Sequence, residues 1–310
     1  MLSQSLQWQA FRTAWLRLIC PCPVLVVISD QSLLCSWRNG RQACFRAVAL
    51  PEGVCRDGLP QQSDALAECL ADLVFDLELP GAELVLSLPP VAAAWSVVDG
   101  LNADSSDAIR RIRERVCNSD LPFHPDQSYL AASPLSNGVA LAALPRASLC
   151  AWVDVVERAD LPLRRIGWTL FEALRVVLQL NKEWHGDLAW LLVQQEGVRL
   201  ILIRDQIPEV DHQWSSREVD GCCVEIRALL RSWQSSLAGF RPLGWWLTLD
   251  DTSTSDWLGL VDADLDEHCL NRPIPWLPEP WNDLSAPEML PPLAHLALMS
   301  LHEQESWPHQ

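Results

Sequence analysis

The stretch PVLVVISDQSLLCSWRNGRQACFRAVALPEGVCRDGLP, residues 23–60, decides the fold. Its first part, PVLVVIS, is a run of apolar and β-branched residues bounded by Pro23 and Asp30, which is typical of a buried strand. SLLCSWR and RQACFRAVALP follow, separated by the turn dipeptide Asn39-Gly40, and together they predict a hairpin. These residues therefore predict a three-stranded antiparallel meander.

A second copy of this pattern begins after the polar stretch NKEWHGD, residues 181–187, which is the predicted boundary between two halves. LAWLLVQQ, a turn at Glu196-Gly197 and VRLILIRDQIPEVDHQW predict another hairpin, which is followed by a helix at 224–237 and the strand GWWLTLD. In the first half the meander is likewise followed by a helix, at 63–79, and by the strand ELVLSL. Two copies of the same unit predict a duplicated α/β fold.

The segment between the two copies predicts further elements. They are a helix at 105–117, strands at 127–132 and 138–144, a helix at 146–158, a short strand LRRIGW and a helix at 169–180. A Pro-rich stretch at 273–292 precedes a last helix at 292–302.

Composition narrows the classes of function. The 310 residues are 49% apolar and carry a formal net charge of −17. So acidic a chain is repelled by phosphate backbones and by anionic lipid, which argues against nucleic-acid binding and favours a partner with a basic tail. The 16 Trp residues are interpreted either as core or as an interface. No run of about 20 apolar residues predicts a membrane span.

The 11 cysteines form no CxxC pair and stand mostly among apolar neighbours. This pattern is typical of free thiols in a reducing cytosol and predicts no metal site. Residues 3–19 predict an amphipathic helix with an apolar face of Trp8, Phe11, Trp15 and Leu18. That face either packs on its own domain or binds a membrane or a partner, and Arg12 and Arg17 within the segment argue against a secretory signal peptide.

Five stretches resemble, in order, the PilM family of type IV pilus machinery. AVALPEGVCRDGLP is similar to the family's "LPxGxxxDG", and ALAECLADLVFDLELPGAELVLSLP to its next helix and strand. DLPFHPDQSYLAA resembles the inserted subdomain of PilM and FtsA. VALAALPRASLCAWVDVVERADLPLRRIGWTLFEALRVV is similar to a further long segment of the family, and APEMLPPLAHLALMSL is similar to its closing helix.

The resemblance implies an actin-like fold, with two duplicated RNase H-like halves and an inserted α+β subdomain in the first half. The implied division is an N-terminal helix at 1–22, a first half at 23–90 and 164–181, an inserted subdomain at 91–163, a second half at 182–290 and a C-terminal helix and tail at 291–310. The related GspL family of type II secretion shares this fold.

The resemblance also implies a partner and a location. The partner is the cytoplasmic tail of a PilN-like bitopic inner-membrane protein, besides other pilus assembly proteins. The chain itself is expected in the cytoplasm, peripheral to the inner membrane and without direct insertion into it. A groove beside the inserted subdomain is expected to hold the tail, lined by Leu86, Leu88, Trp95, Tyr129 and Leu130.

Actin-like ATPases bind phosphate at two hairpins, and the first hairpin of this chain departs from the family pattern "IDIGSSSIKL". In VVISDQSLLC the family's Asp falls on Val27, its Gly on Ser29 and its Lys on Leu34. Ser32 is the polar position that survives. Asp30 is either a turn residue or, after a shift of register, a replacement for the lost metal-binding carboxylate.

The second hairpin and the adenine-side loop depart as well. The family's "LVDIGAxxT" places its Asp on Leu192 and its Gly on Gln194, and Asp250 and Asp251 stand where two glycines belong. Two carboxylates there would repel a polyphosphate. The sequence thus predicts a non-catalytic scaffold without a cofactor, where ATP–Mg²⁺ binds only if the degenerate site still accepts it.

Two alternatives remain open at this stage. One is an active actin-like ATPase or sugar kinase with a divergent nucleotide site. The other is a divergent protein that kept the fold and changed its partner. Other catalytic motifs are missing from the sequence, including GxSxG, the P-loop, GxGxxG and HExxH.

Overall fold

The computed structural model describes residues 21–39, 42–79, 81–99, 124–135, 138–182, 184–194, 197–215, 218–236, 241–249, 271–273 and 292–304, with positions 110, 114 and 257. These residues form two compact units. Unit 1 comprises residues 1–176, 286–290 and 294–310, and unit 2 comprises residues 177–285 and 291–293. The division falls inside a helix, shortly before the predicted linker at 181–187. The predicted N-terminal helix at 3–19 lies outside the described residues.

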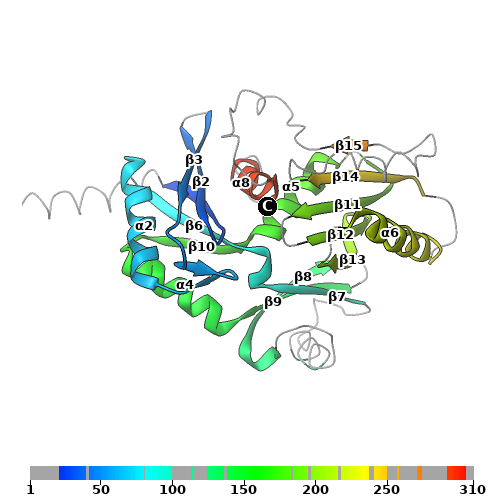
Figure 1. Ribbon diagram of the computed structural model, residues 1–310, viewed down its shortest axis with the longest axis horizontal. Helices are drawn as coiled ribbons and strands as arrows, with labels where there is room; N and C mark the ends of the chain where they lie inside the picture. The colour runs from blue at the N-terminus through cyan, green and yellow to red at the C-terminus, as the bar shows by residue number, and fades with distance from the viewer. Residues whose placement is uncertain are drawn as a thin grey trace, which may run out of the picture. The chain divides into compact units, whose positions relative to one another are not determined.

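The sheet of unit 1 has five strands (Figure 1). They are β1 (Cys22–Ile28), β2 (Ser32–Asn39), β3 (Gln42–Ala49), β6 (Ala82–Leu88) and β10 (Leu163–Trp168). The first three pair antiparallel, with Asn39 opposite Gln42 at the tip, which confirms the predicted meander. β6 pairs parallel with β1, and β10 parallel with β6, so the spatial order is β10-β6-β1-β2-β3.

Helices α2 (Ser63–Asp76) and α4 (Arg146–Arg158) cover one face of this sheet (Figure 1). Their apolar stripes pack against the alternate strand residues that point to that face, because side chains of a strand alternate between its two faces. Fully buried members of this core include Val24, Leu33, Leu70, Leu86 and Val155.

Two further helices form hydrogen bonds with unit 1. They are α5 (Thr169–Leu180), which is bonded at its first residue, and α8 (Pro292–Gln304), which is bonded within its buried part. Thr169 donates its hydroxyl to the carbonyl of Leu88 at 2.7 Å. The hydroxyl of Ser36 in β2 donates to the carbonyl of Leu298 at 3.2 Å. Residues 293–300 are buried throughout. The last helix, predicted from sequence as a separate C-terminal element, therefore belongs largely to the core of unit 1.

The inserted segment carries a three-stranded sheet of order β7-β9-β8. Its strands are β7 (Ala94–Asp99), β8 (Ser128–Leu135) and β9 (Gly138–Pro145), with short 3-10 turns η1 (Pro90–Ala92) and η2 (Pro125–Gln127). Two more strands, β4 (Cys55–Arg56) and β5 (Leu59–Pro60), form a small hairpin that the sequence pattern did not predict, as it did not predict β7. Most of the predicted helix at 105–117 lies outside the described residues.

Unit 2 repeats the plan of unit 1, with the strand order β13-β12-β11-β14-β15. Its elements are β11 (Asp187–Gln194), β12 (Gly197–Arg204), β13 (Ile207–Trp214), α6 (Val219–Gln234), β14 (Leu243–Leu249) and β15 (Asn271–Pro273). β11, β12 and β13 form an antiparallel meander, and β14 pairs parallel with β11 as β6 does with β1. One face of the sheet packs against α6.

Two predicted boundaries in unit 2 are wrong. The stretch 198–214 is not one strand of a hairpin but two strands, because Asp205 and Gln206 have φ angles of 49° and 66° and reverse the chain. Left-handed backbone is unusual outside Gly, so composition alone did not mark this turn. Helix α6 begins at Val219 rather than at 224. Cys222 already belongs to its buried stripe with Ile226 and Leu230, but Asp220 and Gly221 are poor helix formers and obscured this start in the sequence.

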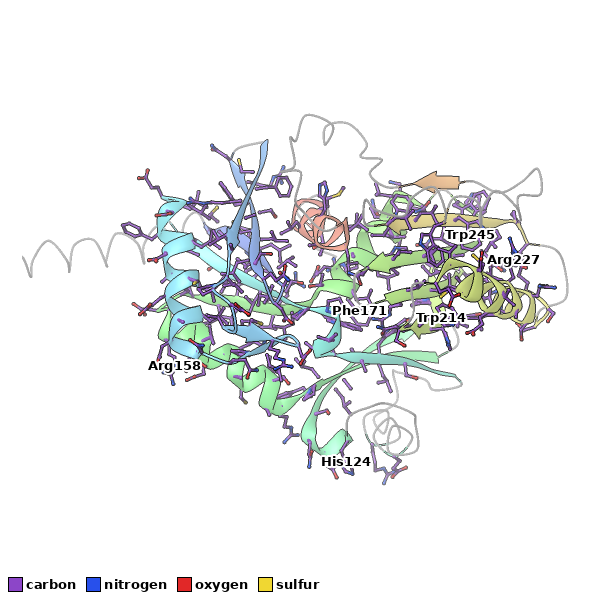
Figure 2. All side chains as sticks on the ribbon, in the orientation of Figure 1. His124, Arg158, Phe171, Trp214, Arg227 and Trp245 are labelled. Carbon is purple, nitrogen blue, oxygen red and sulfur yellow. The ribbon has the colours of Figure 1, made fainter. Side chains whose placement is uncertain are left out.

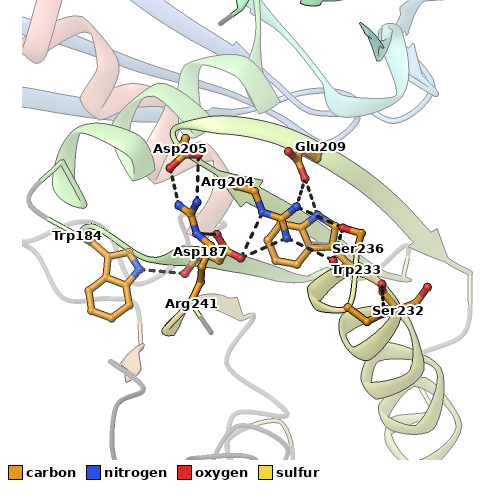
Figure 3. A network of polar contacts seen from close by, with 10 residues as sticks. Trp184, Asp187, Arg204, Asp205, Glu209, Ser232, Trp233, Ser236 and Arg241 are labelled. Atoms are coloured by element: carbon orange, nitrogen blue, oxygen red, sulfur yellow. Dashed lines mark hydrogen bonds and ion pairs between the residues drawn. The ribbon is translucent and has the colours of Figure 1, made fainter. Parts of the chain in front are cut away.

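A network of buried charges closes the end of unit 2 where β11 begins and β12 ends (Figure 3). The Arg204 guanidinium lies 3.4 Å from the Asp187 carboxylate and 3.0 Å from that of Glu209, and it stacks over the ring of Trp233 at 4.2 Å. Nε of Arg241 lies 2.9 Å from the other Asp187 oxygen. Gln194 and Gly197, between which the sequence places the turn of the second phosphate hairpin, pair at the opposite end of these strands.

Candidate functional site

The first candidate phosphate hairpin has apolar residues at its two key positions, and both are buried in the structure. Val27 and Leu34 stand where the family has its Asp and Lys, and they face each other across β1 and β2. Each is only 2% exposed. Both charges of the family pattern are thus replaced by one buried apolar pair, which can bind neither phosphate nor a hydrated metal ion.

The turn between β1 and β2 already uses two of its backbone amides. The N–H of Ser29 donates to the carbonyl of Ser32 at 2.9 Å, and the N–H of Ser32 donates to Oγ of Ser29 at the same distance. The two hydroxyl oxygens lie 2.8 Å apart. A phosphate-binding turn needs its amides directed outward at the ligand, whereas these two close the turn on itself.

The carboxylate of Asp30 accepts hydrogen bonds from three other residues of the protein. Its Oδ2 accepts the N–H of Asp57 at 2.8 Å, and its Oδ1 accepts the N–H of Gly58 at 3.0 Å and the thiol of Cys55 at 3.7 Å. The thiol is buried, and burial followed by the charge of Asp30 raises the pKa of Cys55 to about 12. This geometry favours the interpretation of Asp30 as a turn residue over that of a metal ligand.

The second hairpin offers no polar side chain at the key position either. Leu192 is fully buried and lies between Arg199 and Thr248 on the neighbouring strands. Gln194 is half-buried and pairs with Gly197 at the end of the ladder. Asp250 and Asp251 lie outside the described residues. Among the described residues no group of three or more His, Cys, Asp or Glu is arranged to hold a metal ion.

Two residues assigned to the partner groove are in the core instead. Leu86 and Leu88 of β6 are fully buried, and both belong to the cluster under α2 and α4. A central strand covered on both faces has no side chain free for a partner, so these two assignments are wrong. The apolar run ELVLSL indicated burial but not which residues of the segment reach the surface.

Trp95 and Leu130 do not line one surface. Trp95 pairs with Ala142 of β9, and Leu130 pairs with the next residue, Ala143. Consecutive residues of a strand point to opposite faces, so the two side chains lie on opposite faces of the small sheet. Trp95 is 9% exposed and packs edge-on against Phe171, with 6.0 Å between ring centroids. Figure 2 labels Phe171.

Tyr129 is exposed, as a groove residue should be. Half of its surface is accessible, and the guanidinium of Arg146 lies 5.3 Å from its ring centroid. It pairs with Leu144, two residues from the partner of Trp95, and so it shares a face with Trp95. Every Trp whose burial is described is buried or half-buried, so none of these tryptophans is exposed as Tyr129 is.

Sequence reasoning missed the exposed apolar residues Leu59 and Val91, which are 37% and 55% exposed. Both lie close to Gly58: Leu59 follows it in the chain, and a Cβ on Gly58 would lie 3.2 Å from Cγ2 of Val91. The dipeptide Asp57-Gly58 is a recognised turn signal and could have marked this site.

Comparison with known proteins identifies the fold. No protein-family model and no curated sequence matches the chain. A solved structure of the PilM–PilN type IV pilus biogenesis complex is 16% identical over 92% of this chain and 99% of that chain, with a TM-score of 0.68. The cytoplasmic domain of EpsL from the type II secretion system of Vibrio cholerae is 10% identical over 91% and 95%, with a TM-score of 0.53.

A protein of unknown function from Bacteroides thetaiotaomicron, described as having the actin-like ATPase fold, is 6% identical over 81% of this chain and 90% of that chain, with a TM-score of 0.54. Of the helices that the structure describes, none combines the length and apolarity that crossing a membrane requires. The two units with their matching strand orders, taken together with these similarities, establish that the chain has the actin-like fold, and its structure is similar to that of PilM.

Proposed function

We propose that this chain is a non-catalytic adaptor of a type IV pilus or type II secretion-like assembly complex. The observation that carries the proposal is the buried pair Val27 and Leu34, which replaces both charged positions of the first phosphate hairpin. The occupied amides of Ser29 and Ser32 support it further. In this role the protein acts in the cytoplasm and reaches the inner membrane through its partners.

The proposed partner is the cytoplasmic tail of a PilN-like bitopic membrane protein. Support comes from the likeness to the PilM–PilN complex and from the exposed apolar residues Leu59, Val91 and Tyr129. Leu59 in β5, Val91 in η1 and Tyr129 in β8 are side chains of the kind that anchor an extended or helical tail. The chain's net charge of −17 would favour a tail with basic residues through electrostatic steering.

Val91→Asp is expected to weaken binding of the labelled tail of the PilN-like protein from the same genome by at least about tenfold, because it places a charge in an apolar contact. Fluorescence anisotropy with the purified full chain measures this. Val224→Asp is the matched control, since Val224 is 66% exposed on α6 of unit 2 and the same change there should leave affinity unaltered. Equal effects of the two substitutions, or no binding by the unaltered protein, would contradict the proposal.

ATP–Mg²⁺ is expected to bind no more tightly than about millimolar, because the two hairpin positions that should face phosphate and metal are apolar. Isothermal titration calorimetry and thermal unfolding with and without EDTA test this. A ligand at 100 times its Kd would add about 2.7 kcal/mol of stability, which a melting curve detects readily. Micromolar affinity would instead favour an active ATPase or kinase.

A further inference from the structure

The turn at Arg56–Leu59 is held by a carboxylate from a distant part of the chain. Asp57 and Gly58 have φ angles of 50° and 71°, the left-handed pair that a type I′ turn requires. Both of their N–H groups point at Asp30, which accepts them at 2.8 and 3.0 Å. Adjacent backbone amides of this kind form an anion site, and here the anion is supplied by the protein itself.

Two other elements hold the same turn. Nε1 of Trp152 in α4 donates to the carbonyl of Gly58 at 3.0 Å, and Trp152 is fully buried. On the η1 side, a Cβ at Gly58 would meet Cγ of Pro89 at 2.5 Å, so the backbone there tolerates no side chain. η1 is tied in turn by Nε1 of Trp168, which donates to the carbonyl of Pro90 at 3.1 Å.

Exposed apolar residues lie next to this turn. Leu59 follows Gly58 in the chain, and a Cβ on Gly58 would lie 3.2 Å from Cγ2 of Val91 in η1. Both Leu59 and Val91 are exposed, although the neighbouring Val54 and Cys55 are buried. Without the Asp30 contacts, two backbone N–H groups of this turn would lose their charged acceptor. Asp30 therefore bears on the conformation of the turn that leads into Leu59 and that lies next to Val91.

We propose that Asp30 is a positioning residue for partner binding: its carboxylate sets the Asp57-Gly58 turn so that Leu59 and Val91 present one preformed apolar surface to the partner's tail. In this proposal the first hairpin positions a protein-binding surface, whereas the corresponding hairpin of actin-like ATPases binds phosphate and its metal ion. This inference rests on the proposed adaptor function. Preorganisation of the surface lowers the cost of ordering it on binding.

Asp30→Asn tests the proposal, because it keeps the size of the side chain but turns one of its acceptors into a donor. Both measurements are made well below the melting temperature of the variant. We expect faster hydrogen exchange at the amides of Asp57 and Gly58. We also expect the affinity for the tail to fall by about tenfold. Asp76→Asn is the matched control, since Asp76 is an exposed acid of unit 1 whose contact is with Arg46.

A double-mutant cycle separates positioning from a general loss of stability. If Asp30 acts through the Val91 surface, the affinity losses of Asp30→Asn and Val91→Asp will be less than additive in the double variant. Unchanged exchange at the turn, unchanged tail affinity, or full additivity would each overturn the proposal. If the unaltered protein binds no tail, the adaptor function fails by itself, and exchange at Asp57 and Gly58 then decides whether Asp30 anchors the turn.

Discussion

Replacing Arg204 with alanine is expected to lower the free energy of unfolding by about 3–5 kcal/mol, the usual cost of removing one partner from a buried ion pair. Arg204 and Asp187 have side chains only 7% and 2% exposed. The substitution leaves the Asp187 carboxylate buried beside Arg241 alone, and it removes the cation that stacks on Trp233. Urea denaturation followed by tryptophan fluorescence and circular dichroism measures the change.

Two further variants test whether the stability lost in Arg204→Ala comes from leaving a buried charge unpaired. Arg158→Ala removes a cation that contacts Asp64 and Asp154 at the surface, where solvent screens the charges, and it should change stability little. Combining Arg204→Met with Asp187→Asn removes the unpaired charge and should recover part of the loss. Equal stabilities of the Arg204→Ala and Arg158→Ala variants would contradict the assignment of the network as a main support of unit 2.

Trp152→Ala is expected to destabilise unit 1 by about 3–5 kcal/mol, as large-to-small substitutions of buried aromatic residues do. Trp152 is a residue of α4 whose side chain is fully buried in the core, and its indole N–H donates to the carbonyl of Gly58. The substitution opens a cavity between α4 and the sheet and leaves the Gly58 carbonyl without this donor. The midpoint of denaturant unfolding reports the loss.

Trp152→Phe separates the two contributions, because it retains most of the apolar volume and removes only the indole N–H. An unpaired buried carbonyl costs about 1–3 kcal/mol, so this variant should lie between the parent and Trp152→Ala. Its faster hydrogen exchange should be centred on residues 55–60. Identical stability of Trp152→Phe and the parent would mean that the bond to Gly58 contributes nothing measurable.

Most of the fold could be predicted from local patterns. PVLVVIS and its hairpin, the helical stripe of Leu66, Leu70 and Leu73, and the repeat of the same unit after residue 187 each follow from apolar periodicity and turn residues. Elements with a long, regular pattern were found in this way. The turn at Asp205-Gln206 was not, since it contains neither Gly nor Pro. The strand β7 was overlooked because its apolar run is short.

The candidate groove was predicted less well. Apolar character identified Leu86, Leu88, Trp95 and Leu130, but burial in the core and exposure at a docking surface select the same residue types. The strand order of the sheet shows that Leu86 and Leu88 lie in a central strand and are buried. The pairing with Ala142 and Ala143 shows that Trp95 and Leu130 lie on opposite faces of the small sheet. The exposed residues Leu59 and Val91 became visible once the turn at Asp57-Gly58 was located.

By itself, the sequence determined the duplicated architecture and the loss of charge at Val27 and Leu34, because strand periodicity and side-chain chemistry are local properties. The tertiary structure alone decided the contacts of Asp30. Its carboxylate meets the amides of Asp57 and Gly58 from a different hairpin. No pattern within either segment specifies that contact, because it depends on how β1, α4 and the small β4–β5 hairpin pack in space.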